Sequence, residues 1–330
     1  MNRREFVNRS LLAGASLSLA SGSLSPGQIT GGPVIDAHCH AGRGLNYGKD
    51  NPPSDPWTTY NDPQWTLRRM EEAGIDQTVI FPINNTTYRQ SNEEIAGYVR
   101  QWPTKFIGFA KHDAKTEAGQ IRDLLHHEVR QLGLRGLKLH GVPSQEMVQA
   151  AAELGIPILF HPPGVDASLD MVRSYPKVPF ILAHLGCFAS QNWREHVRAI
   201  EAARQIPNLY LDTSSVVFVR YLEQAVRELP AEKLLFGSDG PLVDARVELY
   251  KIRLLKLPPE KEALVLAGNI RRLLGPWKSL RTSHEQLTRL DFHRLDSSLV
   301  GCSPGSSRST GWQCLFTSAP YPTLAPVDPC

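Results

Sequence analysis

The stretch Val34-Ile-Asp-Ala-His-Cys-His40 decides how the rest of the chain is interpreted. It is a short apolar run, typical of a buried strand, and it ends in two histidines separated by one residue. Alternate residues of a strand point to the same face, so we expect His38 and His40 to point one way and the intervening cysteine the other. Gly42 and Gly44 predict a turn directly after this strand. Two imidazoles that converge on one point form half of a site for a divalent metal ion.

The same pattern recurs along the chain, because later apolar runs also end in histidine or aspartate. Several runs are continuously apolar, which is typical of parallel strands buried on both faces. About eight alternating strand and helix units predict a (β/α)8 TIM barrel of the α/β class over residues 31–277. A doubly wound open sheet is the alternative, but the glycine-rich phosphate-binding turn GxGxxG is absent after the first strand. The predicted strands are 34–38, 77–82, 105–110, 136–140, 157–161, 179–184, 209–212 and 233–239, and the predicted helices between them include 64–73, 92–101, 117–131, 144–154, 169–175, 193–205 and 219–229.

In such a barrel, the residues at the C-terminal ends of all the strands point into one shallow bowl. A histidine or aspartate at one strand end is weak support for a site, because core and edge histidines are common. Five histidines and one aspartate at strand ends are not explained by chance placement. The candidates at strand ends are His38, His40, Lys138, His140, His161, His184 and Asp239, and His112 lies just past the third strand.

The segments that carry this pattern resemble the amidohydrolase superfamily, specifically the amidohydrolase-related branch that includes aminocarboxymuconate-semialdehyde decarboxylase. The resemblance covers about residues 33–276 and implies the barrel fold. It rests on Ile35-Asp-Ala-His-Cys-His40, Gly136-Leu-Lys-Leu-His140, Leu159-Phe-His-Pro-Pro163, Ile181-Leu-Ala-His-Leu-Gly186, Asn208-Leu-Tyr-Leu-Asp-Thr213, Leu234-Leu-Phe-Gly-Ser-Asp239 and Gly268-Asn-Ile-Arg-Arg-Leu-Leu-Gly275.

The resemblance implies a mononuclear metal site. In that site His38, His40, His161 and Asp239 would bind one divalent ion. Three imidazoles and a carboxylate suit Zn²⁺, and Mn²⁺, Co²⁺ and Fe²⁺ accept the same ligands. His184 would lie beside the ion rather than necessarily on it. Asp239 and His184 would then form the catalytic acid–base pair.

Lys138, His140 and Arg43 are the predicted substrate-binding residues. Lys138 would pair with a substrate carboxylate. Its alternatives are a carbamylated bridge between two metal ions, as in binuclear relatives, and a structural pair with a neighbouring acid. Arg43 follows the metal pair directly and would bind an acidic substrate, although a solvated loop charge is an equal alternative.

The expected function is a metal-dependent hydrolase that attacks a small, carboxylate-bearing ester, lactone or amide with a metal-activated water. A metal-dependent decarboxylase of an aromatic or unsaturated carboxylic acid is the first alternative, since the branch contains both activities. A non-catalytic substrate-binding barrel is the second. The complete ligand set argues against it, because a degenerate barrel would usually have lost a ligand. Members of the branch often form dimers, so a homodimer is compatible with the resemblance.

Composition limits the other classes of function. The chain has 330 residues, of which 41% are hydrophobic, and this is enough for one large domain. Its formal net charge is +3, and no basic stripe is interleaved with aromatic residues, so nucleic acid is not an expected partner. Five cysteines form no CxxC pair, which indicates neither a disulfide framework nor a cysteine zinc site. The expected partner is a small-molecule substrate.

The two ends of the chain differ in character from the predicted barrel. Residues 1–30 predict a twin-arginine export signal, because Asn2-Arg3-Arg4-Glu5-Phe6-Val7 precedes a mildly apolar segment that is too short to span a bilayer. A disordered basic start is the alternative. This signal predicts a periplasmic protein with no other membrane association. Residues 278–330 are interpreted as a disordered or non-native tail, since residues 297–330 are rich in Ser, Pro, Thr and Gly.

Overall fold

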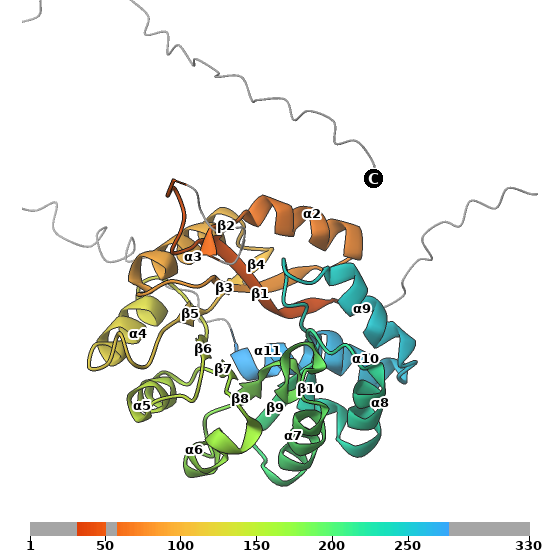
Figure 1. The fold of residues 1–330 in the computed structure, drawn as a ribbon. Helices are drawn as coiled ribbons and strands as arrows, with labels where there is room; N and C mark the ends of the chain where they lie inside the picture. Colours follow the sequence, from red (N-terminus) through yellow and green to blue (C-terminus); the bar gives the residue numbers. More distant parts are fainter. Residues whose placement is uncertain (1–31, 51–57, 277–330) are drawn as a thin grey trace, which may run out of the picture. The chain divides into compact units, whose positions relative to one another are not determined.

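The computed structural model describes residues 32–50 and 58–276. Within these residues the strands lie at the centre and the helices lie around them (Figure 1). The predictions for the export signal at 1–30 and for the tail at 278–330 fall outside the described residues. None of the helices in the described ranges is long and apolar enough to cross a membrane.

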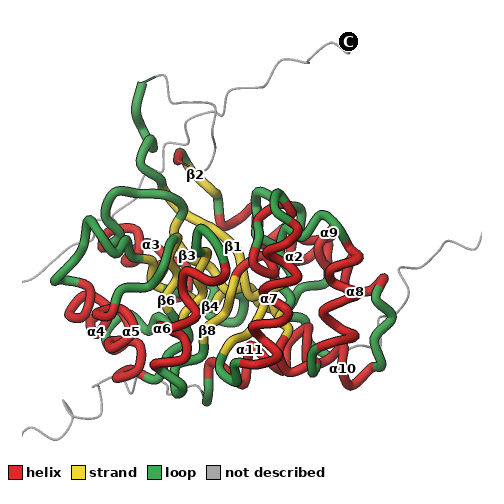
Figure 2. The backbone as a smooth tube through the Cα atoms, turned by 60° about the horizontal axis from the view of Figure 1, so that its bottom comes forward, coloured by secondary structure: helices red, strands yellow, loops and turns green. Residues whose placement is uncertain are grey.

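Strands and helices alternate along the chain in the predicted order. Helices surround the strands in a second view as well (Figure 2). The strands are β1 (Ile35–Arg43), β2 (Tyr60–Asn61), β3 (Gln77–Pro82), β4 (Phe106–Gly108), β5 (Ala110–Lys111), β6 (Leu137–His140), β7 (Ile158–His161), β8 (Phe180–Leu182), β9 (Leu209–Asp212) and β10 (Leu234–Leu235). The α-helices are α2 (Pro63–Ala73), α3 (Arg89–Gln101), α4 (Ile121–Arg130), α5 (Gln145–Leu154), α6 (Leu169–Ser174), α7 (Trp193–Gln205), α8 (Val219–Glu228), α9 (Ala245–Leu254), α10 (Pro259–Ala263) and α11 (Asn269–Leu274).

The strands form a closed parallel barrel. Their hydrogen-bonded order is β2-β1-β3-β4 in one sheet and β10-β9-β8-β7-β6-β5 in the other, and the short β2 pairs antiparallel with β1. β4 and β5 form one barrel strand that is interrupted at Phe109. The barrel closes between β1 and the segment after β10, where the Asp239 N–H donates to the His38 carbonyl (2.7 Å) and the His40 N–H to the Gly240 carbonyl (2.7 Å). The predicted (β/α)8 barrel is therefore confirmed.

Two apolar layers hold the barrel together. The inner layer fills the barrel and includes Ile35, Phe81 and Phe109, and α11 joins it through Ile270. The outer layer packs the strands against the surrounding helices. Phe81 and Phe109 are fully buried, and burial of each such side chain stabilises the fold by about 1.5–3 kcal/mol. Because α11 packs on the residues at the start of β1, it covers the N-terminal end of the barrel and leaves the C-terminal end open for the site.

An irregularity in β1 decides which way its histidines point. The pairing of β1 with β3 shifts register between Asp36 and Cys39. Before the shift, Ile35 belongs to the inner layer; after it, Cys39 belongs to the outer layer. Such a bulge changes the phase of the side-chain alternation. It turns His38 and His40 into the barrel, so the prediction that the cysteine points away from both is confirmed.

The predicted ends of β1, β8 and β10 are wrong, and the backbone gives the reasons. β1 does not turn after His40 but continues to Arg43, because β2 pairs with its last residues. β8 ends at Leu182 and β10 at Leu235, earlier than predicted. His184 and Asp239 have φ values of 58° and 59°, in the left-handed region, which a strand does not contain. This conformation costs a non-glycine residue about 1–3 kcal/mol and is typical of functional sites.

Candidate metal centre and active site

The five predicted histidines form a closed ring at the C-terminal ends of the strands. The distances between ring centroids are 5.6 Å for His38–His40, 6.0 Å for His40–His140, 6.0 Å for His140–His161, 4.7 Å for His161–His184 and 4.9 Å for His184–His38. These residues come from β1, β6, β7 and the turn after β8. This arrangement agrees with the prediction that the strand ends bring the five histidines together.

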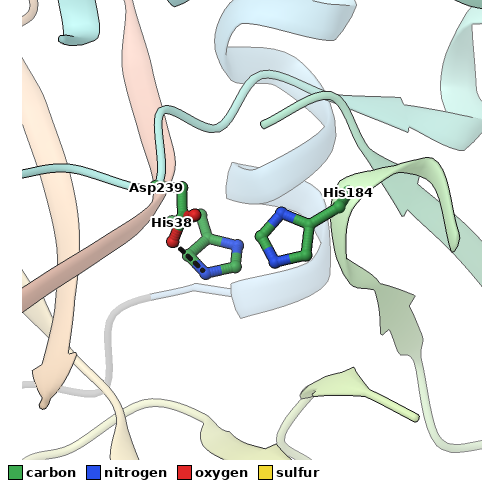
Figure 3. A group of neighbouring side chains, drawn as sticks. All are labelled: His38, His184 and Asp239. Atoms are coloured by element: carbon green, nitrogen blue, oxygen red, sulfur yellow. Dashed lines mark ion pairs between the residues drawn. The ribbon is translucent and has the colours of Figure 1, made fainter. Parts of the chain in front are cut away.

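Asp239 lies against one side of the ring. Its Oδ1 lies 3.3 Å from His38 Nε2 and 3.5 Å from His40 Nε2. The tightest donor group in the described ranges is His38, His184 and Asp239, with ligand atoms that all lie within 4.8 Å of one another. In Figure 3 the His38 and His184 rings face each other, with Asp239 beside His38. A divalent ion lies about 2.0–2.2 Å from such donors, so this spacing fits one ion between them.

The structure does not separate His161 from His184 in the way predicted, with His161 as a metal ligand and His184 beside the ion. His184 was predicted to lie beside the ion, yet it belongs to the tightest donor group. His161 is half-buried and lies next to His184 in the ring, outside that donor group. Both histidines therefore stay candidates for the third imidazole ligand, alongside His38 and His40.

Asp212 orients two of these histidines, and sequence reasoning gave it no role. Its Oδ2 lies 2.7 Å from His38 Nδ1, and its Oδ1 accepts hydrogen bonds from the His184 N–H (3.1 Å) and from Ser214 Oγ (2.5 Å). Ser214 Oγ thus donates to Asp212 and accepts from His184 Nδ1 at 2.9 Å. Both imidazoles then carry their proton on Nδ1 and keep the Nε2 lone pair for a metal. The available signal was that the strand at 209–212 also ends in an aspartate.

A second buried carboxylate fixes the distance between β1 and Asp239. Asp36 Oδ1 accepts from the Ser238 N–H (2.8 Å) and the His38 N–H (3.0 Å), and Oδ2 accepts from Ser238 Oγ (2.5 Å). Burial raises the pKa of Asp36 to about 7, against the hydrogen bonds from Ser238. Ser215 Oγ donates to Asp239 Oδ2 (2.8 Å), which leaves Oδ1 toward the histidines. These contacts hold Asp239 in place before any ion binds.

The histidines of the ring are uncharged at neutral pH. Burial lowers the pKa of His38 and His40 well below the usual value, and it lowers the pKa of His161 to about 4 and that of His184 to about 3. The positive charge of Lys138 adds to this effect at the first three. Metal ligation requires neutral imidazole, so these groups need no deprotonation to bind an ion.

The three predicted substrate-binding residues lie in different surroundings. Lys138 is fully buried, with Nζ 3.4 Å from His38 Nε2, and burial lowers its pKa to about 8. Within the described residues no acid forms an ion pair with Lys138, so the structural pairing considered from sequence is not found there. His140 is exposed at the edge of the ring. The Arg43 side chain is 61% exposed and lies 3.5 Å from Glu94, with its contacts at the rim rather than in the ring.

His112 is a strand-end histidine that faces away from the bowl. Its Nδ1 lies 3.1 Å from Glu117 Oε2 and its Nε2 lies 2.8 Å from Glu128 Oε2, all buried. Burial lowers the pKa of His112, but the two glutamates outweigh this and raise it to about 9. Glu117 also accepts the Tyr88 N–H (2.7 Å). Glu117 is buried, and α4 begins after it, at Ile121 rather than at the predicted residue 117.

We expect His112→Ala to destabilise the protein by about 3–5 kcal/mol, because two buried carboxylates lose their cation. The effect should depend on pH. The folded pKa is raised above the unfolded value of 6.5, so this contribution is complete below pH 6.5 and is lost as the pH rises through about 9. Urea unfolding of both proteins at pH 6 and pH 10 measures it. The exposed His127 on α4 gives the control variant His127→Ala, and equal losses at both pH values would contradict the ion-pair account.

The fold and the site together define a class of protein: a parallel β/α barrel with a candidate metal site, made by two histidines and an aspartate, at the C-terminal ends of its strands. The family model described as amidohydrolase matches residues 35–275, which is almost the whole barrel. The chain therefore belongs to the amidohydrolase family, and the family predicted from the strand-end motifs is confirmed.

Similar proteins include several decarboxylases. The gamma-resorcylate decarboxylase of Polaromonas sp. strain JS666 is 25% identical over 251 residues, which cover 53% of this chain and 76% of that protein. The solved structure of 5-carboxyvanillate decarboxylase from Sphingomonas paucimobilis is 17% identical, with a TM-score of 0.58, over 73% of this chain and 98% of that one.

Two further solved structures contain a metal ion. A dihydroxybenzoic acid decarboxylase from Polaromonas sp. JS666, with bound manganese and 2-nitroresorcinol, is 17% identical, with a TM-score of 0.56, over 73% of this chain and 96% of that one. An amidohydrolase from Burkholderia multivorans with bound zinc is 15% identical, with a TM-score of 0.59, over 73% and 99%. At these identities the likeness concerns the fold, and it agrees with the barrel described above.

Proposed function

We propose that this protein is a metal-dependent carboxy-lyase that removes CO₂ from a small aromatic or unsaturated carboxylic acid. This reverses the order expected from sequence, where hydrolysis came first and decarboxylation second. The observation that carries the proposal is the similarity to gamma-resorcylate decarboxylase, which extends over 76% of that protein. The ring of neutral histidines with Asp239 supports it, because this donor set suits a divalent ion.

His38, His40 and Asp239, with either His161 or His184, would hold the ion. Zn²⁺ and Mn²⁺ both suit this set. When bound, a divalent ion supplies a positive charge that orients an anionic substrate and stabilises negative charge that develops on it. The chain itself supplies the other requirements of the reaction, which are a cation for the substrate and a proton for the product.

Decarboxylation breaks the bond between the carboxylate and its carbon, and the electron pair stays on that carbon until it takes a proton. Asp239 is our candidate for the proton donor: its Oδ1 faces the ring while Ser215 holds Oδ2, so it would take up a proton from solvent and pass it to the carbon. Lys138 would hold an anionic group of the substrate beside the histidines. The buried surroundings exclude bulk water from the reacting carbon.

Hydrolysis is the second candidate, and the tautomer of His184 favours it. With its proton on Nδ1 toward Ser214, the ring presents an Nε2 lone pair that would accept a proton from an attacking water. Decarboxylation has no such requirement. The two reactions leave different atoms in the product, so one experiment separates them.

The test uses the full chain loaded with Zn²⁺ or Mn²⁺, and a panel of carboxyl-¹³C aromatic acids that includes 2,6-dihydroxybenzoate. We expect ¹³CO₂ and, in D₂O, one deuterium on the ring carbon that lost it. In H₂¹⁸O, a panel of aryl esters and lactones reports hydrolysis through ¹⁸O in the acid product. Hydrolysis without ¹³CO₂ would overturn the carboxy-lyase proposal. Ligand binding without either product would favour the alternative that the protein is a non-catalytic, substrate-binding barrel.

A further inference from the structure

Lys111 is a buried lysine that no acid neutralises in the described part of the chain. It ends β5 and is 1% exposed. Its Nζ donates to the carbonyl of Pro82 (3.2 Å) and to Asn84 Oδ1 (3.0 Å), and lies 5.2 Å from the centroid of the Tyr88 ring. Burial and the neighbouring Lys138 lower the pKa of Lys111 well below its usual value, because an ammonium group is costly to bury without a close counter-charge. The metal site described above does not use it.

The ammonium group of Lys111 belongs to the bowl. Lys111 lies beside Lys138 in the register of β5 and β6. After burial, its charge is the largest cause that lowers the pKa of His40 and of His140. It also shares the Pro82 carbonyl with His40, whose Nδ1 lies 3.3 Å from that oxygen. Lys111 therefore occupies the His40 and His140 side of the ring, where His140 is exposed to solvent.

With a divalent ion bound, the bowl would hold more positive charge than its own acids balance. Two lysines, Lys111 and Lys138, share the bowl with Asp212 and Asp239. Asp212 is engaged with His38 and Ser214, and Asp239 would be a metal ligand. A divalent ion would add further positive charge. An ammonium group has three N–H donors, and Pro82 and Asn84 accept only two of those of Lys111.

Resting on the proposed function, we propose that Lys111 is a specificity-determining residue that binds a second carboxylate of the substrate. The counter-charge missing from the chain then arrives with the substrate. The substrate class is a dicarboxylic acid, in which one carboxylate leaves as CO₂ and the other pairs with Lys111. The competing account is structural: Lys111 serves only to tie Pro82 and Asn84 to β5.

Ligand binding tests this without turnover. Metal-loaded full chain and Lys111→Met are titrated calorimetrically with benzoate and with the 1,2-, 1,3- and 1,4-benzenedicarboxylates. We expect the unmodified protein to bind at least one dicarboxylate about 10- to 100-fold more tightly than benzoate, as a charge-assisted hydrogen bond gives. Lys111→Met should lose this preference and keep its affinity for benzoate. The control Lys115→Met removes an equal charge from an exposed site and should keep the preference.

Thermal unfolding and metal content separate the two accounts of Lys111. If its counter-charge comes from substrate, Lys111→Met should unfold at an equal or higher temperature without ligand, because an unpaired buried charge is gone, and it should keep its metal. A lower unfolding temperature with equal loss of affinity for benzoate and dicarboxylates would establish the structural role and overturn the proposal. So would a dicarboxylate preference that survives in Lys111→Met, or that is absent from the unmodified protein. The ¹³CO₂ assay on unmodified protein tests the carboxy-lyase activity separately.

Discussion

Replacing Asp239 by asparagine is expected to lower turnover by at least about 10³-fold, because it removes both a metal ligand and the proposed proton donor. The substitution is nearly isosteric, and the amide oxygen can still accept from Ser215 Oγ. The barrel should therefore stay folded, which circular dichroism and thermal unfolding check. Turnover is measured on the carboxylic acid that unmodified protein consumes most rapidly.

The matched control for this variant is Asp244→Asn. Asp244 follows the same loop and caps α9, away from the histidine ring. We expect it to change stability but to leave turnover close to that of unmodified protein. Turnover that survives in Asp239→Asn would remove Asp239 from the mechanism.

Replacing Asp212 by asparagine is expected to weaken metal affinity by about 10- to 100-fold, as for other partners of ligating histidines. The amide presents one oxygen where the carboxylate presents two. It cannot accept from His38 Nδ1 and also from Ser214 and the His184 N–H, so at least one imidazole loses its orientation. Competition with a fluorescent zinc chelator measures the affinity.

The serine partner of Asp212 offers a graded comparison. Ser214→Ala removes the hydroxyl that lies between Asp212 and His184 Nδ1, but it leaves the pair between Asp212 and His38 and the bond from the His184 N–H to Asp212. We expect a smaller loss of metal affinity than in Asp212→Asn. Equal affinity in Asp212→Asn and in unmodified protein would mean that the carboxylate serves the fold rather than the site.

The sequence predicted the barrel and the membership of the histidine ring because both follow from local patterns. Each apolar run identifies a strand, and its last polar residue marks the end that faces the bowl. His38, His140 and His161 could therefore be placed without knowledge of any long-range contact. The geometry of a parallel barrel then brings the strand ends together.

The residues that orient the site could not be found in this way. Asp212 and His38 are 174 positions apart in sequence. His184 and Asp239 enter the site through left-handed backbone conformations. Nothing in the apolar pattern signals a left-handed turn at a residue other than glycine. The bulge in β1 could not be predicted either, because the sequence of this strand alternates regularly between polar and apolar residues.

Lys111 and His112 show the opposite failure, in which a strand end was placed one residue too early. The predicted strand stopped at residue 110, so Lys111 was treated as loop and only His112 was considered for the site. In the barrel Lys111 is the last residue of β5 and belongs to the bowl, while His112 turns outward to Glu117 and Glu128. Adjacent residues at a strand end point to opposite faces, so only one of these two can face the bowl.

The most direct measurement of the central claim is the number of divalent ions bound per chain, by elemental analysis, in unmodified protein and in Asp239→Asn. The account predicts one ion per chain in the unmodified protein and a large loss in the variant. Two ions per chain would contradict the mononuclear site and favour a bridge through Lys138. No ion in folded protein that was supplied with Zn²⁺ and Mn²⁺ would contradict the metal centre, and the histidine ring would then have to contact the substrate itself.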